Sequence, residues 1–393
     1  MWRYQSISYL MAVSFLLGLA GCASDSPKPA AETPAPSAVA QAEQGQDQPP
    51  AGEVQERAVP RTMPGAIMTP GAPRILQQPA APAVPPSLPC AGGGGILPGQ
   101  YAIGTWRGTY LTAVNGGGRN SEPVVRTDAQ VAGQAEKYKL FVLPSNDPHG
   151  QYFIQTATTN CITAVGGGGR IDNVLNTDRT VAQAWEFFRF YFDPGTGYHA
   201  IQTVSTNYLT ALGGGGHADS PAVHTDAVKV DNWERFHLWK CGDLGSNFRY
   251  SIWVPYNGTL LMAMGGGGRI KDALHAYEAP SGGWGMFMLI KQPDGSYAIQ
   301  TASGNYITAD GGGGLAAGSA NSDVLHTDAT QVQAWERFWF IDQGDCTYRI
   351  QTVKGWYLGF PPSHIVDGKI ASFTTRISDP NAALKFKLIS AFL

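Results

Sequence analysis

The chain has 393 residues, a formal net charge of −3 and 15% charged residues, with 49 glycines and 27 prolines. The net charge is close to neutral and the sequence has no basic stripe, and both observations disfavour recruitment of nucleic acid. Recurrent glycine runs leave no room for long amphipathic helices, which disfavours helical bundles and α/β folds. What remains is an all-β protein of about two or three domains behind an unfolded leader.

The first residues carry an export signal. Arg3 supplies a positive charge, residues 7–20 are mainly apolar, and Leu19-Ala-Gly-Cys22 closes the segment. The stretch is short for a membrane span, so it predicts a signal peptide over residues 1–21. Its end resembles the bacterial lipobox, which implies cleavage before Cys22 and acylation of that cysteine. The alternative is an ordinary signal peptide. Since Ala23 stands where Asp would indicate inner-membrane retention, we expect the outer membrane.

Residues 22–99 form the predicted leader. No Phe, Trp or Tyr occurs in it, and 15 of the 27 prolines lie between Pro27 and Pro89. Such a segment cannot bury enough apolar surface to offset the entropy of ordering. We therefore expect a disordered, partly polyproline II tether between the anchor and the folded part.

From Gln100 onward one unit repeats six times. Each copy has a segment like Ile299-Gln-Thr301, then one like Asn305-Tyr-Ile-Thr-Ala309 and then a glycine run. The last two segments resemble His326-Thr-Asp328 and Trp335-Glu-Arg-Phe338. Such a repeat decides the choice of fold. The equivalent isoleucines, spaced by 51 or 47 residues, are Ile103, Ile154, Ile201, Ile252, Ile299 and Ile350.

Each unit predicts four short strands, with the glycine run at the hairpin between strands two and three. Three such units close a small barrel. We therefore predict two tandem β-trefoils, at residues 100–241 and 242–393. A six-bladed propeller and a continuous solenoid are the alternatives.

The combined motifs resemble the fascin-like, actin-crosslinking type of β-trefoil across all six units. That superfamily also supplies accessory modules of secreted glycoside hydrolases. Two units depart from the pattern: the fourth has Trp284-Gly-Met-Phe287 at strand four, and the sixth reads Gly359-Phe-Pro-Pro362 in place of its glycine run.

An aromatic residue at one strand-four position is expected to form the core, since burying each ring contributes about 2–3 kcal/mol. These residues are Tyr138, Phe188, Phe236, Phe287, Phe338 and Phe386. The Trp-Glu pairs of strand four, such as Trp185-Glu186, admit a sugar-site interpretation. The favoured interpretation is structural, with Trp over the barrel end and Glu accepting backbone N–H bonds at a loop.

The third strand carries candidate ligand-binding residues. Its aspartates are suited to bonding sugar hydroxyls, although an Asx-turn role is the favoured alternative. The candidates are Asp128, Asp178, Asp226, Asp328, His224 and His326. A metal site needs more converging ligands than this His-x-Asp spacing supplies. The glycine runs lack the phosphate-loop pattern.

Three tryptophans interrupt the repeat. Trp106 stands where other units have Ala or Val, Trp253 replaces Gln, and Trp356 replaces Asn. Residues outside the three-fold pattern are freer to stack on a sugar ring, although local packing remains the alternative for each.

Four cysteines follow Cys22, and an exported chain meets oxidising conditions, so three complete pairings are open. Because Cys90 and Cys241 bracket the first trefoil, we expect them to be bonded. Cys241–Cys346 is the competing pair, and Cys161 is expected to be a buried thiol.

No enzyme motif occurs in the sequence, and no cofactor is expected. The sequence thus favours a non-catalytic, lipid-anchored envelope protein that binds a repetitive ligand, most plausibly polysaccharide. The alternatives are a protein-interaction scaffold, for an envelope or host protein or for actin filaments, and a spacer without a ligand.

Overall fold

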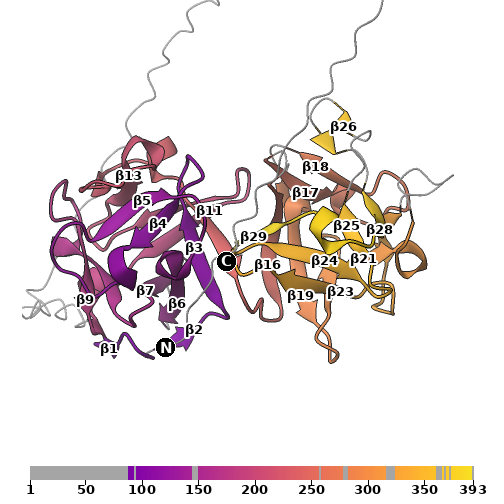
Figure 1. The fold of residues 1–393 in the computed structure, drawn as a ribbon, viewed down its shortest axis with the longest axis horizontal. Helices are drawn as coiled ribbons and strands as arrows, with labels where there is room; N and C mark the ends of the chain where they lie inside the picture. The colour runs from indigo at the N-terminus through magenta and orange to yellow at the C-terminus, as the bar shows by residue number, and fades with distance from the viewer. Residues whose placement is uncertain are drawn as a thin grey trace, which may run out of the picture. The chain divides into compact units, whose positions relative to one another are not determined.

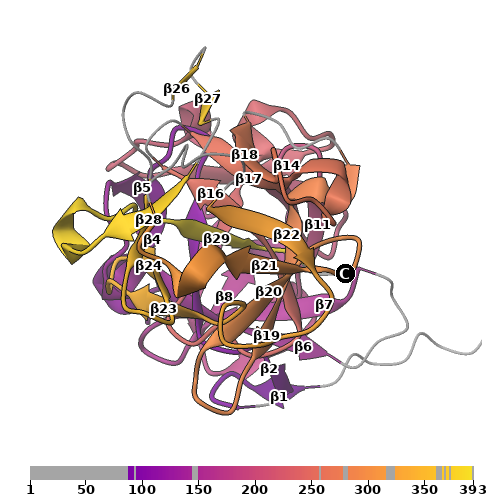
Figure 2. The same ribbon diagram turned by 90° about the vertical axis from the view of Figure 1, so that its right-hand side faces the viewer.

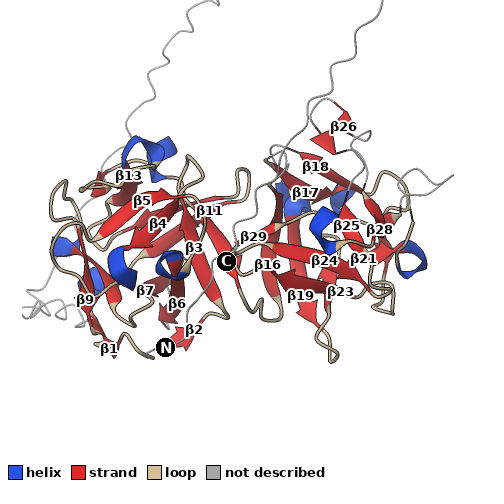
Figure 3. Cartoon of the chain, viewed as in Figure 1, coloured by secondary structure: helices blue, strands red, loops and turns tan. Residues whose placement is uncertain are grey.

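The computed structural model describes residues 87–92, 94–143, 149–255, 258–277, 282–315, 324–359, 365–366, 369–370 and 373–391. They belong to one compact unit. The expected signal peptide, the acylated Cys22 and most of the linker lie outside these residues. Strands dominate, and the helices among the described residues are 3-10 turns of three or four residues (Figure 3).

Three four-stranded units build the first trefoil, which runs from indigo to rose in Figure 1. Its strands are β3 (Gln100–Gly104), β4 (Tyr110–Ala113), β5 (Val125–Ala129), β6 (Lys137–Leu143), β7 (Gln151–Gln155), β8 (Cys161–Ala164), β9 (Leu175–Arg179), β11 (Arg189–Asp193), β12 (Tyr198–Gln202), β13 (Tyr208–Ala211), β14 (Val223–Ala227) and β15 (His237–Cys241). The fourth strand of the third unit, β15, returns to β3, with Leu238 opposite Ile103. This pairing closes a barrel made of first and fourth strands, and the remaining strands form hairpins.

The second trefoil repeats this plan (Figure 2). Its strands are β16 (Phe248–Val254), β17 (Thr259–Ala263), β18 (Leu274–Tyr277), β19 (Met286–Lys291), β20 (Tyr297–Gln300), β21 (Tyr306–Ala309), β22 (Leu325–Ala329), β23 (Phe338–Asp342), β24 (Tyr348–Thr352), β25 (Tyr357–Gly359), β28 (Thr374–Ile377) and β29 (Lys387–Ser390). Strand β29 closes onto β16, with Leu388 opposite Ile252. An added hairpin, β26 (Ile365–Val366) and β27 (Lys369–Ile370), extends the sixth unit and pairs with β18.

Closure after the third and after the sixth unit distinguishes two tandem β-trefoils from a propeller or a solenoid. Each barrel has its own apolar core. The predicted strand-four aromatics are all buried within these cores, which confirms their assignment.

Short 3-10 turns form the hairpin tips and precede the fourth strands. The tips are η1 (Val114–Gly116), η3 (Val165–Gly167), η5 (Leu212–Gly214), η7 (Met264–Gly266) and η9 (Asp310–Gly312), and the others are η2 (Gln134–Glu136), η4 (Ala184–Glu186), η6 (Asn232–Glu234), η8 (Gly282–Gly285) and η11 (Pro380–Ala382). In η3, Gly166 has φ +68°, whereas the equivalent residue of η1 is Asn115 at φ +59°. Asn tolerates this left-handed region, which explains why the first run has only three glycines.

Each glycine tip is inserted against the next unit. A Cβ on Gly168 would lie 2.2 Å from the Thr203 hydroxyl oxygen, and a Cβ on Gly215 would lie 2.2 Å from that of Thr105. The contacts therefore run from unit to unit and return from the third unit to the first. The same approach recurs at Gly117, Gly267 and Gly313.

The third junction of the second trefoil departs from this pattern on both sides. The sixth unit has no glycine run after Gly359. Val254 of the fourth unit stands where the first unit has Thr105, following the aligned Ile252 and Ile103. The missing glycine run of the sixth unit and Val254 of the fourth unit therefore belong to one junction, where both partners of the glycine–threonine contact have been replaced.

The N-terminal arm corrects the expected end of the linker. Strand β1 (Leu88–Pro89) pairs with β10 (Val181–Ala182), and β2 (Gly95–Ile96) pairs with β6. Residues 87–99 were assigned to the tether because two-residue strands among glycines and prolines leave no alternating pattern. They are instead part of the first trefoil.

The disulfides also differ from the expected pair. Cys90 is bonded to Cys161 and Cys241 to Cys346, so the Cys90–Cys241 pairing was wrong and Cys161 is no free thiol. The reason is the course of the arm. Cys90 donates its N–H to the carbonyl of Thr180 at 2.9 Å, which holds it beside the second unit rather than at the end of β15.

The two trefoils are joined by more than the Cys241–Cys346 bond. Trp239 of β15 lies opposite Ile389 of β29, in an apolar cluster with residues of both trefoils. The Lys387 amine donates to the Tyr110 hydroxyl at 2.6 Å and lies 4.7 Å from the centroid of the Trp239 ring system. Burial lowers the pKa of Lys387 to about 8.

Gly168→Ala is expected to destabilise the first trefoil by about 3 kcal/mol, because the methyl group would overlap Thr203 at a backbone φ of +111°. Gly166→Ala is the control, since its nearest neighbouring atom lies 3.9 Å away. It should cost about 1 kcal/mol. Urea unfolding measures both variants, and equal losses would contradict the role given to the close contact.

Stability should fall in acid. Burial lowers the pKa values of His199 and His237 to about 3. Between pH 6.5 and 3 the unfolded chain therefore binds more protons, so the free energy of unfolding decreases as the pH falls, by about 1.4 kcal/mol per pH unit for each group. Urea unfolding across this range should show a shallower dependence for His237→Gln than for the wild type. An unchanged slope in His237→Gln would refute this assignment.

Candidate functional site

The predicted Thr-Asp pairs divide into a structural and an outward residue. Thr225 is fully buried, and its hydroxyl accepts the N–H of Arg170 at 3.2 Å. Thr127, Thr177 and Thr327 make the equivalent bonds to the residue after a glycine run. These threonines therefore hold neighbouring units together and are not available to a ligand.

The outward aspartates lie one per unit on β5, β9, β14 and β22, and the structure does not gather them into one site. Oδ1 of Asp328 lies 2.6 Å from Nδ1 of His326, and Oδ1 of Asp226 lies 3.8 Å from Nδ1 of His224. In the described part of the chain, no Asx-turn bond from a backbone N–H two residues on to the carboxylate is formed by Asp128, Asp178, Asp226 or Asp328. Their ligand-binding role stays a prediction.

The strand-four glutamates are held from two sides. Glu186 accepts the backbone N–H of Gln183 at 2.8 Å and the Thr163 hydroxyl at 2.7 Å. Glu234 and Glu336 make the same two kinds of bond. The structural interpretation of these carboxylates is confirmed, since each oxygen of Glu186 accepts a hydrogen bond from within the unit.

The tryptophans beside these glutamates are half-exposed platforms. Trp185, Trp233 and Trp335 are 45%, 48% and 46% exposed. Each indole edge lies against the glycine tip of its own unit: a Cβ on Gly167 would be 3.5 Å from Cδ1 of Trp185. A bare backbone beside an indole leaves a shallow surface onto which a flat ring fits.

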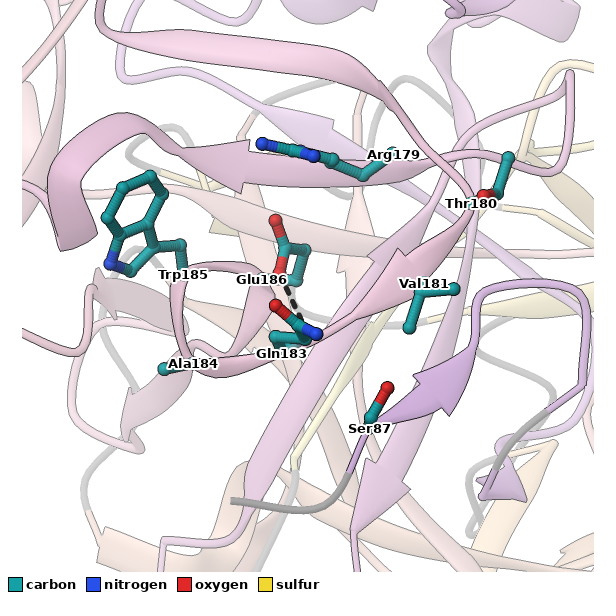
Figure 4. A pocket seen from close by; sticks show the side chains of 8 residues that line it. All are labelled: Ser87, Arg179, Thr180, Val181, Gln183, Ala184, Trp185 and Glu186. Atoms are coloured by element: carbon teal, nitrogen blue, oxygen red, sulfur yellow. Dashed lines mark hydrogen bonds between the residues drawn. The ribbon is translucent and has the colours of Figure 1, made fainter. Parts of the chain in front are cut away.

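At Trp185 this surface deepens into a cavity of about 600 Å³. Trp185 and Arg179 line it with Glu186 between them, and Ser87 of the N-terminal arm lies beyond Val181 (Figure 4). The remaining lining residues are Thr180, Gln183 and Ala184. We call this cavity the Trp185 groove.

The N-terminal arm gives the Trp185 groove its wall. Strand β1 pairs with β10 directly before η4, and the Gln155 amide donates to the carbonyl of Cys90 at 2.5 Å. Together with the Cys90–Cys161 bond, these contacts hold Ser87 at the edge of the groove, directly before the Leu88–Ala182 pair. The groove therefore combines one aromatic face, one guanidinium, the Glu186 carboxylate and several neutral polar groups, which is the mixed apolar and polar lining of a small-molecule site.

The three unpatterned tryptophans have different surroundings. Trp253 packs against the cluster between the trefoils, 5.9 Å from the centroid of Trp239, which accounts for its departure from the repeat. Trp356 rests on Gly314, whose Cβ would lie 2.8 Å from the indole nitrogen. Trp106 is 38% exposed and shares a glycine tip with Trp233.

Within the described ranges, no group of three or more His, Cys, Asp or Glu side chains is placed to hold a metal ion. The same part of the chain has no helix long and apolar enough to cross a membrane.

Sequence reasoning missed the Trp185 groove because its wall comes from the arm that was assigned to the tether. One signal was present: Arg179 follows Thr-Asp where the first, third and fifth units have alanine. A long cation at a position that is otherwise small indicated a local difference in the second unit.

No protein-family model matches the chain, and no curated protein matches its sequence. Among solved structures it is similar to a mosquitocidal holotoxin, at 11% identity and a TM-score of 0.31 over 75% of this chain and 34% of that one. It therefore spans about a third of the holotoxin's length. A designed three-fold symmetric protein, ThreeFoil, gives 13% identity and a TM-score of 0.30 over 36% of this chain and 99% of that one. The BEL β-trefoil gives 14% identity and a TM-score of 0.29 over 38% of this chain and 97% of that one.

Thr163→Val should cost about 2 kcal/mol, because it leaves the buried Glu186 carboxylate without one of its donors. The control is Thr112→Val in the first unit, where the buried hydroxyl has no hydrogen-bond partner among the described residues. That change should be close to neutral. Equal losses in urea unfolding would show that the Thr–Glu bond contributes nothing specific.

Proposed function

We propose that the chain is a non-catalytic carbohydrate-binding protein whose principal site is the Trp185 groove. The observation that carries this proposal is the half-exposed indole of Trp185 in a cavity beside Arg179 and Gln183. Sugar rings present an apolar C–H face and a rim of hydroxyls. The indole matches the first, and the guanidinium, amide and hydroxyl groups match the second.

The size of the groove agrees with a ligand of one or a few sugar rings, since small-molecule sites typically enclose about 300–1,000 Å³. Binding rather than catalysis is supported by the state of Glu186. Its two oxygens accept bonds from Gln183 and Thr163, which gives this carboxylate a structural role.

A polymer suits the arrangement of the platforms. Trp233, Trp284 and Trp335 repeat the indole-on-glycine surface without the deeper wall. Weak contacts of this kind within one rigid chain add through effective concentration when the ligand is itself repetitive.

We further propose that acylation of Cys22 anchors the chain in the outer membrane of the cell envelope, in view of Ala23, with residues 23–86 as the tether. The resemblance of the repeat to fascin-like trefoils, which occur as modules of secreted glycoside hydrolases, agrees with a polysaccharide ligand. An envelope protein partner is the competing proposal.

The first test is a pull-down of the full chain on insoluble cellulose, chitin, xylan and peptidoglycan, together with a glycan array. Trp185→Ala should weaken binding to the retained polymer about tenfold, which corresponds to 1.4 kcal/mol. The matched control Trp335→Ala removes an equally exposed indole without a groove and should change binding less than twofold.

Equal losses in the two variants would move the principal site away from the Trp185 groove. Failure to retain any glycan would refute carbohydrate binding and favour a protein partner.

A further inference from the structure

The glycine tip between the third and the first unit differs from the other tips in its aromatic content. A Cβ on Gly214 would lie 3.3 Å from Cδ1 of Trp106 and 3.5 Å from Cδ1 of Trp233, so two indoles from different units converge above one glycine. We call this place the Gly214 junction.

The other junctions hold fewer aromatic groups. At Gly167 and Gly312 one tryptophan faces a valine, and at Gly266 Trp284 faces an alanine. At Gly116 the nearest atoms belong to Ala157 and Thr158, and the strand-four position there is Ala135. The chain therefore contains a natural series of zero, one and two indoles on the same backbone scaffold.

The Gly214 junction also carries two cations. The Cγ atom of Arg107 lies 3.5 Å from the position that a Cβ on Gly214 would take. The Arg235 guanidinium lies over the Trp106 ring, 5.9 Å from its centroid. The cation–π contact positions Arg235 beside the indole surface.

Neither arginine is neutralised by a carboxylate in the described part of the chain. Arg235 bonds Asn232 at 3.4 Å, and the nearby Asp231 is paired with Lys229 at 2.9 Å. In the fifth unit, by contrast, Arg337 occupies the position of Arg235 and is paired with Asp294 at 3.0 Å. The free charge is thus a property of the Gly214 junction and not of the motif.

We propose that the Gly214 junction binds anionic sugar residues, with the ring against Trp106 and Trp233 and the carboxylate or sulfate on Arg107 and Arg235. Planar guanidinium groups bind both kinds of oxyanion through paired N–H donors. This inference rests on the proposed carbohydrate-binding function and adds a second, charge-selective site to the Trp185 groove.

The test measures affinity of the full chain, at low and at moderate salt, for polygalacturonate, its neutral methyl ester, dextran sulfate and dextran. We expect both anionic polymers, or one of them, to bind at least fivefold more tightly than the neutral counterpart, with the difference reduced by salt. The uronate and sulfate arms identify which oxyanion is recognised.

Arg235→Gln and Trp106→Ala should each remove this preference, and Arg107→Gln should reduce it. The matched control Arg337→Gln should leave it unchanged, and thermal unfolding checks that each variant is folded. Trp185→Ala should weaken the binding of neutral polymers as well as that of anionic ones.

The outcomes separate the two proposals. If neutral polymers bind through Trp185 and anionic polymers do not bind more tightly, this inference alone is overturned. The same conclusion follows if the preference for anionic polymers survives Arg235→Gln. Absence of binding to every polymer tested here and in the glycan panel would overturn both.

Discussion

The structure depends on the close approach between each glycine tip and a threonine of the next unit. Without a side chain at Gly168 or Gly215, the tip backbone reaches the Thr203 or Thr105 hydroxyl, and the following residues bond a buried threonine of strand three. This contact sets the orientation of each hairpin relative to its neighbour. It also leaves the tip bare on its outer side, which is where the tryptophans of the 3-10 turns before the fourth strands lie. Fold and candidate binding surface thus arise from the same constraint.

Much of the fold could be predicted from the sequence because it repeats. Isoleucines at a regular interval and an aromatic residue in each fourth strand indicate six equivalent units, and three such units close a barrel. The role of Glu186 was also within reach, since a carboxylate three residues after the start of a tight turn is placed to accept its backbone N–H. Repetition lets one unit be interpreted from the other five.

What could not be predicted lies where the repeat is broken or where the chain returns to a distant unit. Strand β1 has two residues and no alternation, so nothing local indicates its pairing with β10. The Cys90–Cys161 bond depends on that pairing, and the spacing of the cysteines in the sequence does not indicate it. Trp253 departs from the pattern because it faces the other trefoil, a neighbour that no single-unit comparison includes. The convergence of Trp106 and Trp233 has the same origin, since 127 positions separate them and only barrel closure joins the units that carry them.

The replaced junction of the second trefoil has a consequence for cooperativity. In the first trefoil the glycine–threonine contacts form a closed ring, so no unit can separate without breaking two of them. In the second, Val254 makes no such contact with a glycine among the described residues, and the sixth unit instead reaches the fourth through the pairing of β27 with β18. Cooperativity across this junction therefore depends on backbone pairing of an added hairpin, where the first trefoil uses a bare glycine against a threonine.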